Sequence, residues 1–88
     1  MYYAHIADSF KQDAQKLKKE DKKLHSKVLE LIINTLETPY EGIGKPEALK
    51  GDSEGYWSRR IDAKHRLIYK VEGDAVEFIS CYGHYGDK

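Results

Sequence analysis

The sequence predicts an α+β fold, in which an antiparallel helix hairpin packs on one face of a four-stranded, mostly antiparallel sheet. Two stretches in the first half have apolar residues at helical spacing, and three stretches in the second half alternate between apolar and polar residues. A short aromatic and β-branched run precedes both sets. Helices followed by strands are typical of layered α+β domains, and a chain of 88 residues is expected to form one domain over residues 1–88.

The first half is expected to be a strand and two helices. The run from Met1 to Ala7 favours a strand, after which Asp8-Ser9 offers an N-cap for the first helix. That helix has only a thin apolar stripe beside a solvated lysine face, whereas the second has a broader stripe and is expected to be the main core helix. Glu20-Asp21 is expected to cap the second helix, and Thr38-Pro39 to end it.

The second half is expected to be a loop and three strands. Residues 40–55 contain four glycines and Pro46, which predicts an irregular loop. Alternating residues then predict strands over 56–61, 66–72 and 75–82, with a short turn after the first and a hairpin at Gly73-Asp74 after the second. These connections make the sheet antiparallel, with the helix pair on one face.

Composition narrows the class of protein. Fifteen basic residues balance fifteen acidic ones, so any binding of nucleic acid must depend on where the charges lie. The single cysteine, Cys81, excludes an intramolecular disulfide and is expected to be a small internal residue. We see no signal peptide and no apolar run long enough for a membrane span, and we expect a cytoplasmic protein without a membrane partner.

A carboxylate followed by cations marks the candidate site. Glu47 precedes a run in which Lys45 to Lys70 contains seven Lys or Arg and four acids, and His84 lies near the end of the chain. A base, an acid and cations for a phosphate are the requirements of metal-free phosphodiester cleavage. The four histidines are scattered and no metal-ligand spacing is present, so we expect no metal and no cofactor.

The residues alone leave two interpretations of this run. Arg59, Arg60 and Arg66 are costly to bury, so they are expected to face water or an anion. They could form a solvated sheet face with salt bridges to neighbouring acids, or a basic face that holds RNA phosphates. Nearby aromatic residues could stack on unpaired bases, although Trp57 also fits a core or dimer contact.

Four segments in order resemble the motifs of one family. They are Gly44-Lys45-Pro46-Glu47-Ala48-Leu49-Lys50, Gly55-Tyr56-Trp57-Ser58-Arg59-Arg60-Ile61, His65-Arg66-Leu67-Ile68-Tyr69 and Cys81 to Tyr85. With this spacing the chain resembles the YoeB/Txe toxins of the RelE/ParE superfamily. The resemblance implies the toxin of a type II toxin–antitoxin pair, which enters the ribosomal A site and cuts mRNA there.

The resemblance also implies roles for individual residues. Glu47 would be the general base and His84 the general acid, while Arg66, helped by Arg60, would hold the scissile phosphate. Tyr85 would orient the nucleotide. Lys50 would contact phosphate or stabilise the site, and Arg59 is grouped with Lys50 and Arg60 as RNA- or phosphate-binding.

The implied partners are a YefM/Axe-type antitoxin, the ribosome with its mRNA, and a second copy of the chain in a homodimer. The alternative is a superfamily member that does not cleave RNA and acts by protein binding, as the ParE-like inhibitors of gyrase do. Loss of Glu47 and His84 separates the two, since only the first depends on them for toxicity.

Overall fold

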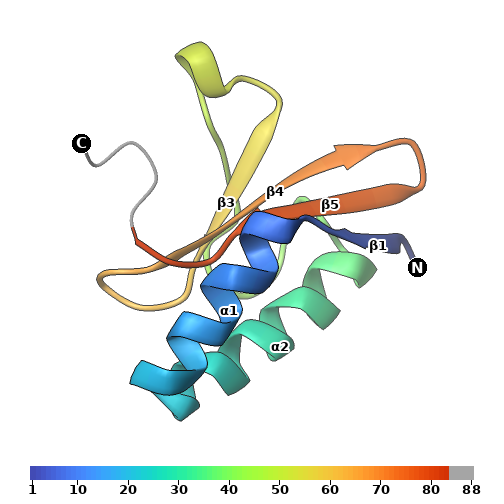
Figure 1. Cartoon of the computed structure of the whole chain (residues 1–88). Coiled ribbons are helices and arrows are strands. Elements are labelled where there is room, and N and C mark those ends of the chain that lie inside the picture. Colours follow the sequence, from blue (N-terminus) through green and yellow to red (C-terminus); the bar gives the residue numbers. More distant parts are fainter. Residues whose placement is uncertain (84–88) are drawn as a thin grey trace.

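The computed structural model describes residues 1–83. Two helices lie together on one side of a twisted sheet, as Figure 1 shows. In chain order the elements are β1 (Tyr3–Ile6), α1 (Asp8–Glu20), α2 (Lys22–Glu37), β2 (Glu47–Ala48), a 3-10 turn (Gly51–Ser53), β3 (Tyr56–Arg60), β4 (Arg66–Glu72) and β5 (Ala75–Ser80). The α+β class and the helix hairpin are confirmed.

The sheet has five strands, not the predicted four. Their order is β1-β5-β4-β3-β2, with β1 parallel to β5 and every other pair antiparallel. The additional strand, β2, is a two-residue edge strand inside the segment that was expected to be loop throughout. It forms because Glu47 pairs with Ser58, and Ala48 with Trp57, along the edge of β3.

The helix termini follow the prediction at α2 and depart from it at α1. Asp21 caps α2, since its Oδ1 accepts hydrogen bonds from the backbone N–H groups of Lys23 and Leu24 at 3.0 and 3.2 Å. The expected cap at Asp8-Ser9 is wrong. Ala7 occupies the N-cap position without a side-chain bond, and the Ser9 hydroxyl donates instead to the carbonyl of Ile79 in β5 at 2.6 Å.

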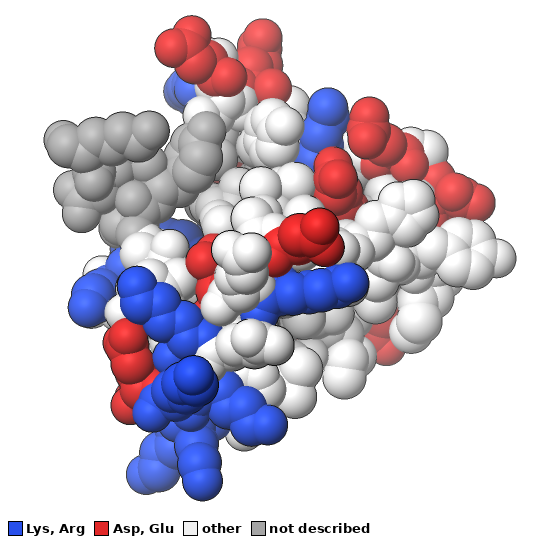
Figure 2. All heavy atoms as spheres, in the orientation of Figure 1, with Lys and Arg blue, Asp and Glu red and all other residues white. Residues whose placement is uncertain are grey.

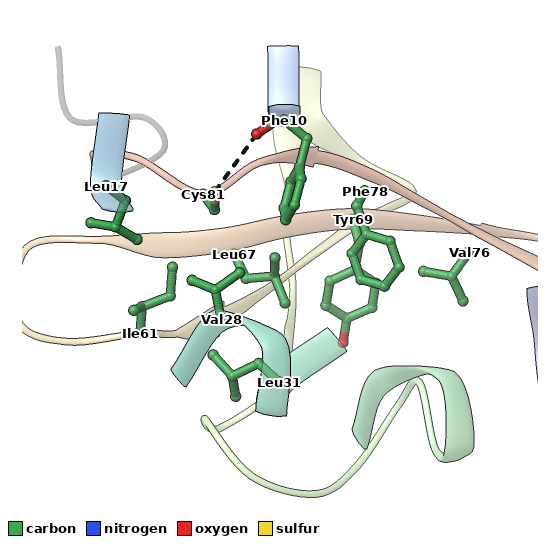
Figure 3. Packing of buried hydrophobic residues seen from close by; sticks show 10 residues of the cluster. All are labelled: Phe10, Leu17, Val28, Leu31, Ile61, Leu67, Tyr69, Val76, Phe78 and Cys81. Atoms are coloured by element: carbon green, nitrogen blue, oxygen red, sulfur yellow. Dashed lines mark hydrogen bonds between the residues drawn. The ribbon is translucent and has the colours of Figure 1, made fainter. Parts of the chain in front are cut away.

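The core lies between the helices and the sheet. Figure 3 shows its buried side chains, which are Phe10, Leu17, Val28, Leu31, Ile61, Leu67, Tyr69, Val76, Phe78 and Cys81. The pairing of β4 with β5 shifts between Ile68 and Tyr69, which pair with Ser80 and Phe78. One residue of β5, Ile79, is therefore extra, and Phe78 and Cys81 both reach the core. The expectation that Cys81 is a small internal residue is confirmed, although uninterrupted alternation along the strand would put Ser80, and not Cys81, on the face of Phe78.

Candidate active site on the outer sheet face

The face of the sheet opposite the helices carries three of the predicted site residues, which are Glu47, Arg60 and Arg66. We call it the outer sheet face. Leu67 and Tyr69 of β4 point into the core. The residues that alternate with them, Arg66, Ile68 and Lys70, therefore point to the opposite face of the sheet. Cross-strand pairing then places Glu47, Ser58, Ile68 and Ser80 in one row across four strands, since partners in adjacent strands share a face.

Glu47 reaches this row because the loop before it is fixed to the rest of the fold. The N–H of Arg60 donates to the carbonyl of Gly44 at 2.6 Å, which holds the loop against the end of β3. A side chain at position 44 would meet Leu31 Cδ2 at 2.9 Å and the Arg60 carbonyl oxygen at 3.1 Å, and the φ of +79° also favours glycine. Glu47 itself is exposed, so its carboxylate is accessible.

Arg60 and Arg66 lie side by side next to the Glu47 row. They are direct partners in the pairing of β3 with β4, two residues along from Ser58 and Ile68. Neighbouring strands are about 4.8 Å apart, so the backbone of β2 lies about 10 Å from that of β4. Glu47 and Arg66 thus flank the strand that carries Arg60, and among residues 1–83 neither arginine forms an ion pair with a carboxylate.

Among residues 1–83, the guanidinium of Arg66 is bound through one of its three nitrogens. Its Nη1 donates to the carbonyls of Asp62 and His65 at 2.5 and 3.0 Å. An arginine has five N–H donors, and both hydrogen bonds use Nη1. Nε and Nη2 therefore have no partner within the described part of the chain. Those two nitrogens form the fork that binds carboxylate or phosphate oxygens in a bidentate manner.

The turn between β3 and β4 fixes these carbonyls. The Asp62 carboxylate accepts hydrogen bonds from the N–H groups of Lys64 and His65 at 2.9 and 2.7 Å. Desolvation raises the pKa of Asp62, but the two backbone donors and the charge of Arg66 outweigh it, so the pKa lies below its usual value. The ionised Asp62 therefore stabilises the turn that orients Arg66.

Arg59 is not part of this face, and its predicted exposure is wrong. The side chain is fully buried on the helix side of the sheet. Its guanidinium donates to Tyr69 Oη and Asn34 Oδ1, and to the carbonyls of Thr38, Glu41 and Ile43. Burial is tolerated because the exit of α2 supplies polar partners, with the cation at a helix C-terminus. In this position Arg59 is unavailable to a phosphate.

The other predicted residues divide between the two sides of the sheet. Lys50 is exposed just before the 3-10 turn, at the far end of the β2 segment from Gly44. Tyr56 lies on the outer sheet face opposite Lys70, whose Nζ is 5.4 Å from the ring centroid. Trp57 points to the helix side and packs against Tyr40, with ring centroids 5.0 Å apart. Of these two aromatic side chains, only Tyr56 accompanies the cations.

His84 and Tyr85 lie outside the described residues. The last described residue, Gly83, is bound from two sides: the Arg66 N–H donates to its carbonyl at 3.0 Å, and its own N–H donates to His65 Nδ1 at 2.8 Å. Sequence reasoning gave no role to His65, which is 4% exposed. The only signal for it was its position directly before Arg66.

Charge is concentrated away from the sheet as well. Figure 2 shows lysine and arginine side chains gathered over the end of the hairpin where α1 meets α2, and acidic groups at the opposite end of the molecule. Exposed lysines of this end are Lys16, Lys18, Lys19, Lys22 and Lys23.

Within residues 1–83, no helix has the length and apolar character needed to cross a membrane.

Comparisons with known proteins agree with one another. A family model described as a YoeB-like toxin of bacterial type II toxin–antitoxin systems matches residues 6–85. Toxin YoeB of Escherichia coli K12 is 49% identical over 65 residues, which cover 74% of this chain and 77% of the relative. A YoeB/ParE toxin structure from Agrobacterium tumefaciens superimposes with a TM-score of 0.89 at 42% identity, covering 94% of this chain and 99% of that one.

YoeB from Staphylococcus aureus is a third relative, 36% identical to this chain. It has been solved as a dimer, with a TM-score of 0.84 over 96% of this chain and 98% of that one. It has also been solved in a heterotetrameric complex with YefM, with a TM-score of 0.83 over 97% of this chain and 99% of that one.

Proposed function

The chain belongs to the YoeB-like toxins of bacterial type II toxin–antitoxin systems, and from this we propose that it is a ribosome-dependent endoribonuclease that cuts mRNA in the A site. The observation that carries the proposal is the outer sheet face, where an exposed Glu47 lies one strand from Arg60 and two strands from Arg66 without ion-pairing to either. Because the carboxylate and the guanidinium groups are not paired with one another, Glu47 is available as a base and the two arginines are available to bind a phosphate. Action on the ribosome requires a cytoplasmic location.

The proposed reaction is transfer of the phosphodiester to the neighbouring 2′-oxygen. The Glu47 carboxylate takes the proton of a ribose 2′-OH, and the 2′-oxygen attacks the adjacent phosphorus. The bond from phosphorus to the 5′-oxygen breaks, and His84 gives a proton to that leaving oxygen. The products are a 2′,3′-cyclic phosphate and a 5′-hydroxyl end, so atoms and charge balance without any other reactant.

The arginines are proposed to stabilise charge. Arg66 would present Nε and Nη2 to the non-bridging oxygens, where negative charge develops in the transition state. Its partner Arg60, exposed beside it, would bind an adjacent phosphate. In the same proposal Lys50 contacts the backbone further along, and Tyr85 orients the nucleotide.

Two carboxylate variants test the base. We expect Glu47→Gln to lower the rate of mRNA cutting on programmed ribosomes by about 10²–10⁴-fold, the usual contribution of a general base. Glu77→Gln is the matched control, because Glu77 pairs with Lys70 on the same sheet face but away from the arginines. It should change the rate less than about twofold.

Mapping the 3′ ends of the fragments supplies the second readout. Cuts within the A-site codon that end in a cyclic phosphate support the proposal. It is wrong if the wild-type protein makes no such cuts, or if Glu47→Gln cuts as fast as wild type. Toxicity that survives the loss of both Glu47 and His84 while translation continues would favour protein binding as the mode of action.

The proposed partner is a YefM-type antitoxin, as in the heterotetrameric Staphylococcus aureus complex. The YoeB dimer from the same organism supports self-association of this chain. Co-expression with the product of an adjacent short reading frame, followed by mass measurement of the purified assembly, tests both. An antitoxin should abolish the cutting of mRNA, and a chain that purifies alone as a monomer beside its neighbour would contradict the assignment.

A further inference from the structure

A buried histidine holds the chain just before His84. His65 is 4% exposed, and its Nδ1 accepts a hydrogen bond from the N–H of Gly83 at 2.8 Å. A ring nitrogen that accepts carries no proton, so this contact requires the neutral ring with its proton on Nε2. The proposed chemistry does not use His65, which leaves the purpose of this buried polar contact to be explained.

Gly83 is bound on both sides by consecutive residues. While His65 accepts from its N–H, the N–H of Arg66 donates to its carbonyl at 3.0 Å. We call the three residues the Gly83 clamp. The φ of Gly83 is +82°, in the region that favours glycine, so the clamp holds this residue in a backbone conformation that other residues adopt only with strain.

Two other parts of the fold brace the His65 ring. Its backbone N–H donates to Asp62 Oδ1 at 2.7 Å, which ties it to the turn before β4. The ring also packs against Tyr82, with centroids 4.5 Å apart, and the Tyr82 hydroxyl donates to the Glu20 carboxylate at 2.6 Å. The clamp is therefore anchored both to the sheet and to the end of α1.

We propose that His65 is a positioning residue that holds Gly83, the residue directly before the proposed general acid His84 in the sequence. The proposal rests on the proposed function. Gly83 precedes His84, and consecutive Cα atoms are 3.8 Å apart, so the clamp acts one residue from the acid. A displacement of about 1 Å costs on the order of 10²-fold in rate when reacting groups must be aligned. The buried acceptor, His65 Nδ1, limits the displacement of Gly83.

A pair of substitutions separates the hydrogen bond from the volume of the ring. His65→Leu fills much of the space but offers no acceptor, whereas the Oδ1 of His65→Asn takes the place of Nδ1. We expect His65→Leu to lower the single-turnover cutting rate about 10–100-fold with little change in the half-saturating ribosome concentration. His65→Asn should stay within about threefold of wild type. Equal loss in both variants, or none in His65→Leu, would overturn the proposal.

Coupling to the acid is the decisive comparison. If His65 acts through His84, then His65→Leu should have less than a twofold effect in a protein that already carries His84→Ala. A further 10-fold loss in that background would mean that His65 supports the fold or another group, and would contradict the positioning role.

Amide exchange measures the clamp without activity. The Gly83 N–H should exchange slowly in wild type and in His65→Asn, and at least 10-fold faster in His65→Leu. If wild type fails to cut mRNA, the proposed function is lost while this comparison still decides whether the clamp exists. Unchanged exchange in His65→Leu refutes the clamp itself.

Should His65→Leu fail to fold, Gly83→Ala carries the test. Among residues 1–83 no atom lies within 4 Å of a Cβ added at Gly83, so the substitution acts through the backbone preference. Gly51→Ala is the control, with a φ of +70° and equally open space. Gly83→Ala should slow cutting at least 10-fold and Gly51→Ala less than twofold. Equal rates in the two variants would refute the proposal.

Discussion

The adjacent arginines of β3 provide a matched pair, because they point to opposite faces of the sheet. Arg59 is fully buried, and Arg60 is exposed beside Arg66. We expect Arg59→Met to lower stability while leaving the outer sheet face intact, and Arg60→Met to lower cutting of ribosome-bound mRNA while leaving stability unchanged. Methionine is chosen because it keeps most of the length of the side chain.

The expected loss of stability in Arg59→Met depends on which hydrogen-bond acceptors of Arg59 still have another partner. Asn34 Oδ1 still accepts from the N–H of Ile43, and the Tyr69 hydroxyl still donates to the carbonyl of Pro39. The Thr38 and Glu41 carbonyls keep local donors as well.

Ile43 is different, because its carbonyl has no other recorded partner among residues 1–83. One unsatisfied carbonyl costs about 1–3 kcal/mol, and losing a cation at a helix C-terminus costs roughly 0.3–2 kcal/mol. The free energy of unfolding should therefore fall by about 2–4 kcal/mol.

Chemical and thermal unfolding check this value. For a domain of this size, about 2–4 kcal/mol corresponds to a fall in Tm of roughly 10–30 °C. Arg60→Met should change the free energy of unfolding by less than about 0.5 kcal/mol. The reasoning is refuted if Arg59→Met is as stable as wild type, or if it is stable and inactive, since the second result would return Arg59 to the RNA-binding surface.

Three further predictions concern other parts of the fold. Burial, with a smaller contribution from a nearby carboxylate, raises the pKa of Cys81 to about 12, so a thiol reagent at pH 8 should label native protein at least 10²-fold more slowly than unfolded protein. The pKa of Asp62 is lower in the folded state, so its stabilisation is fully present above the ordinary aspartate pKa of 3.8 and is lost as pH falls through the lower pKa of the folded state; acid titration of Asp62→Asn should show a shallower loss of stability there. Gly44→Ala should lower the free energy of unfolding by about 2–4 kcal/mol in urea titration, against about 1–2 kcal/mol for Gly51→Ala, since only position 44 adds a clash with Leu31 to the backbone penalty.

Local sequence patterns were sufficient to predict the elements that show such patterns, namely α2, β3 and β4. The apolar stripe of α2, its Asp21 cap and the alternation of β3 and β4 each involve contacts within one element or one turn, and each was predicted correctly. The strand β2 was missed, because two residues are too few to show alternation. It exists only through pairing with β3, which no local pattern reports.

Two side-chain placements depended on tertiary structure. Alternation had put Arg59 on the same face as Ile61, which is a core residue, but the cost of burying a charge was given more weight. The carbonyls that offset this cost come from the exit of α2, far away in the sequence. Cys81 is internal as expected, but what puts it rather than Ser80 on the core face is the extra residue of β5 in the pairing with β4, which strand alternation does not show.

The candidate site was predictable as a set of residues but not as an arrangement. Motif spacing selected Glu47, Arg60 and Arg66, and the register of three strands places them on one face. His65 was not selected, because a lone histidine carries no signal until its acceptor nitrogen is seen against Gly83.

The parallel pairing of β1 with β5 has a consequence for how the protein is made. Tyr3 pairs with Ala75 and Ile6 with Phe78, so β1 cannot pair until β5 has been synthesised. The helix hairpin depends on nearby residues and can form early, whereas closure of the sheet requires contacts more than 70 residues apart. A nascent chain therefore cannot complete its sheet until β5 has been translated, long after the helix hairpin, and the outer sheet face appears only after that point.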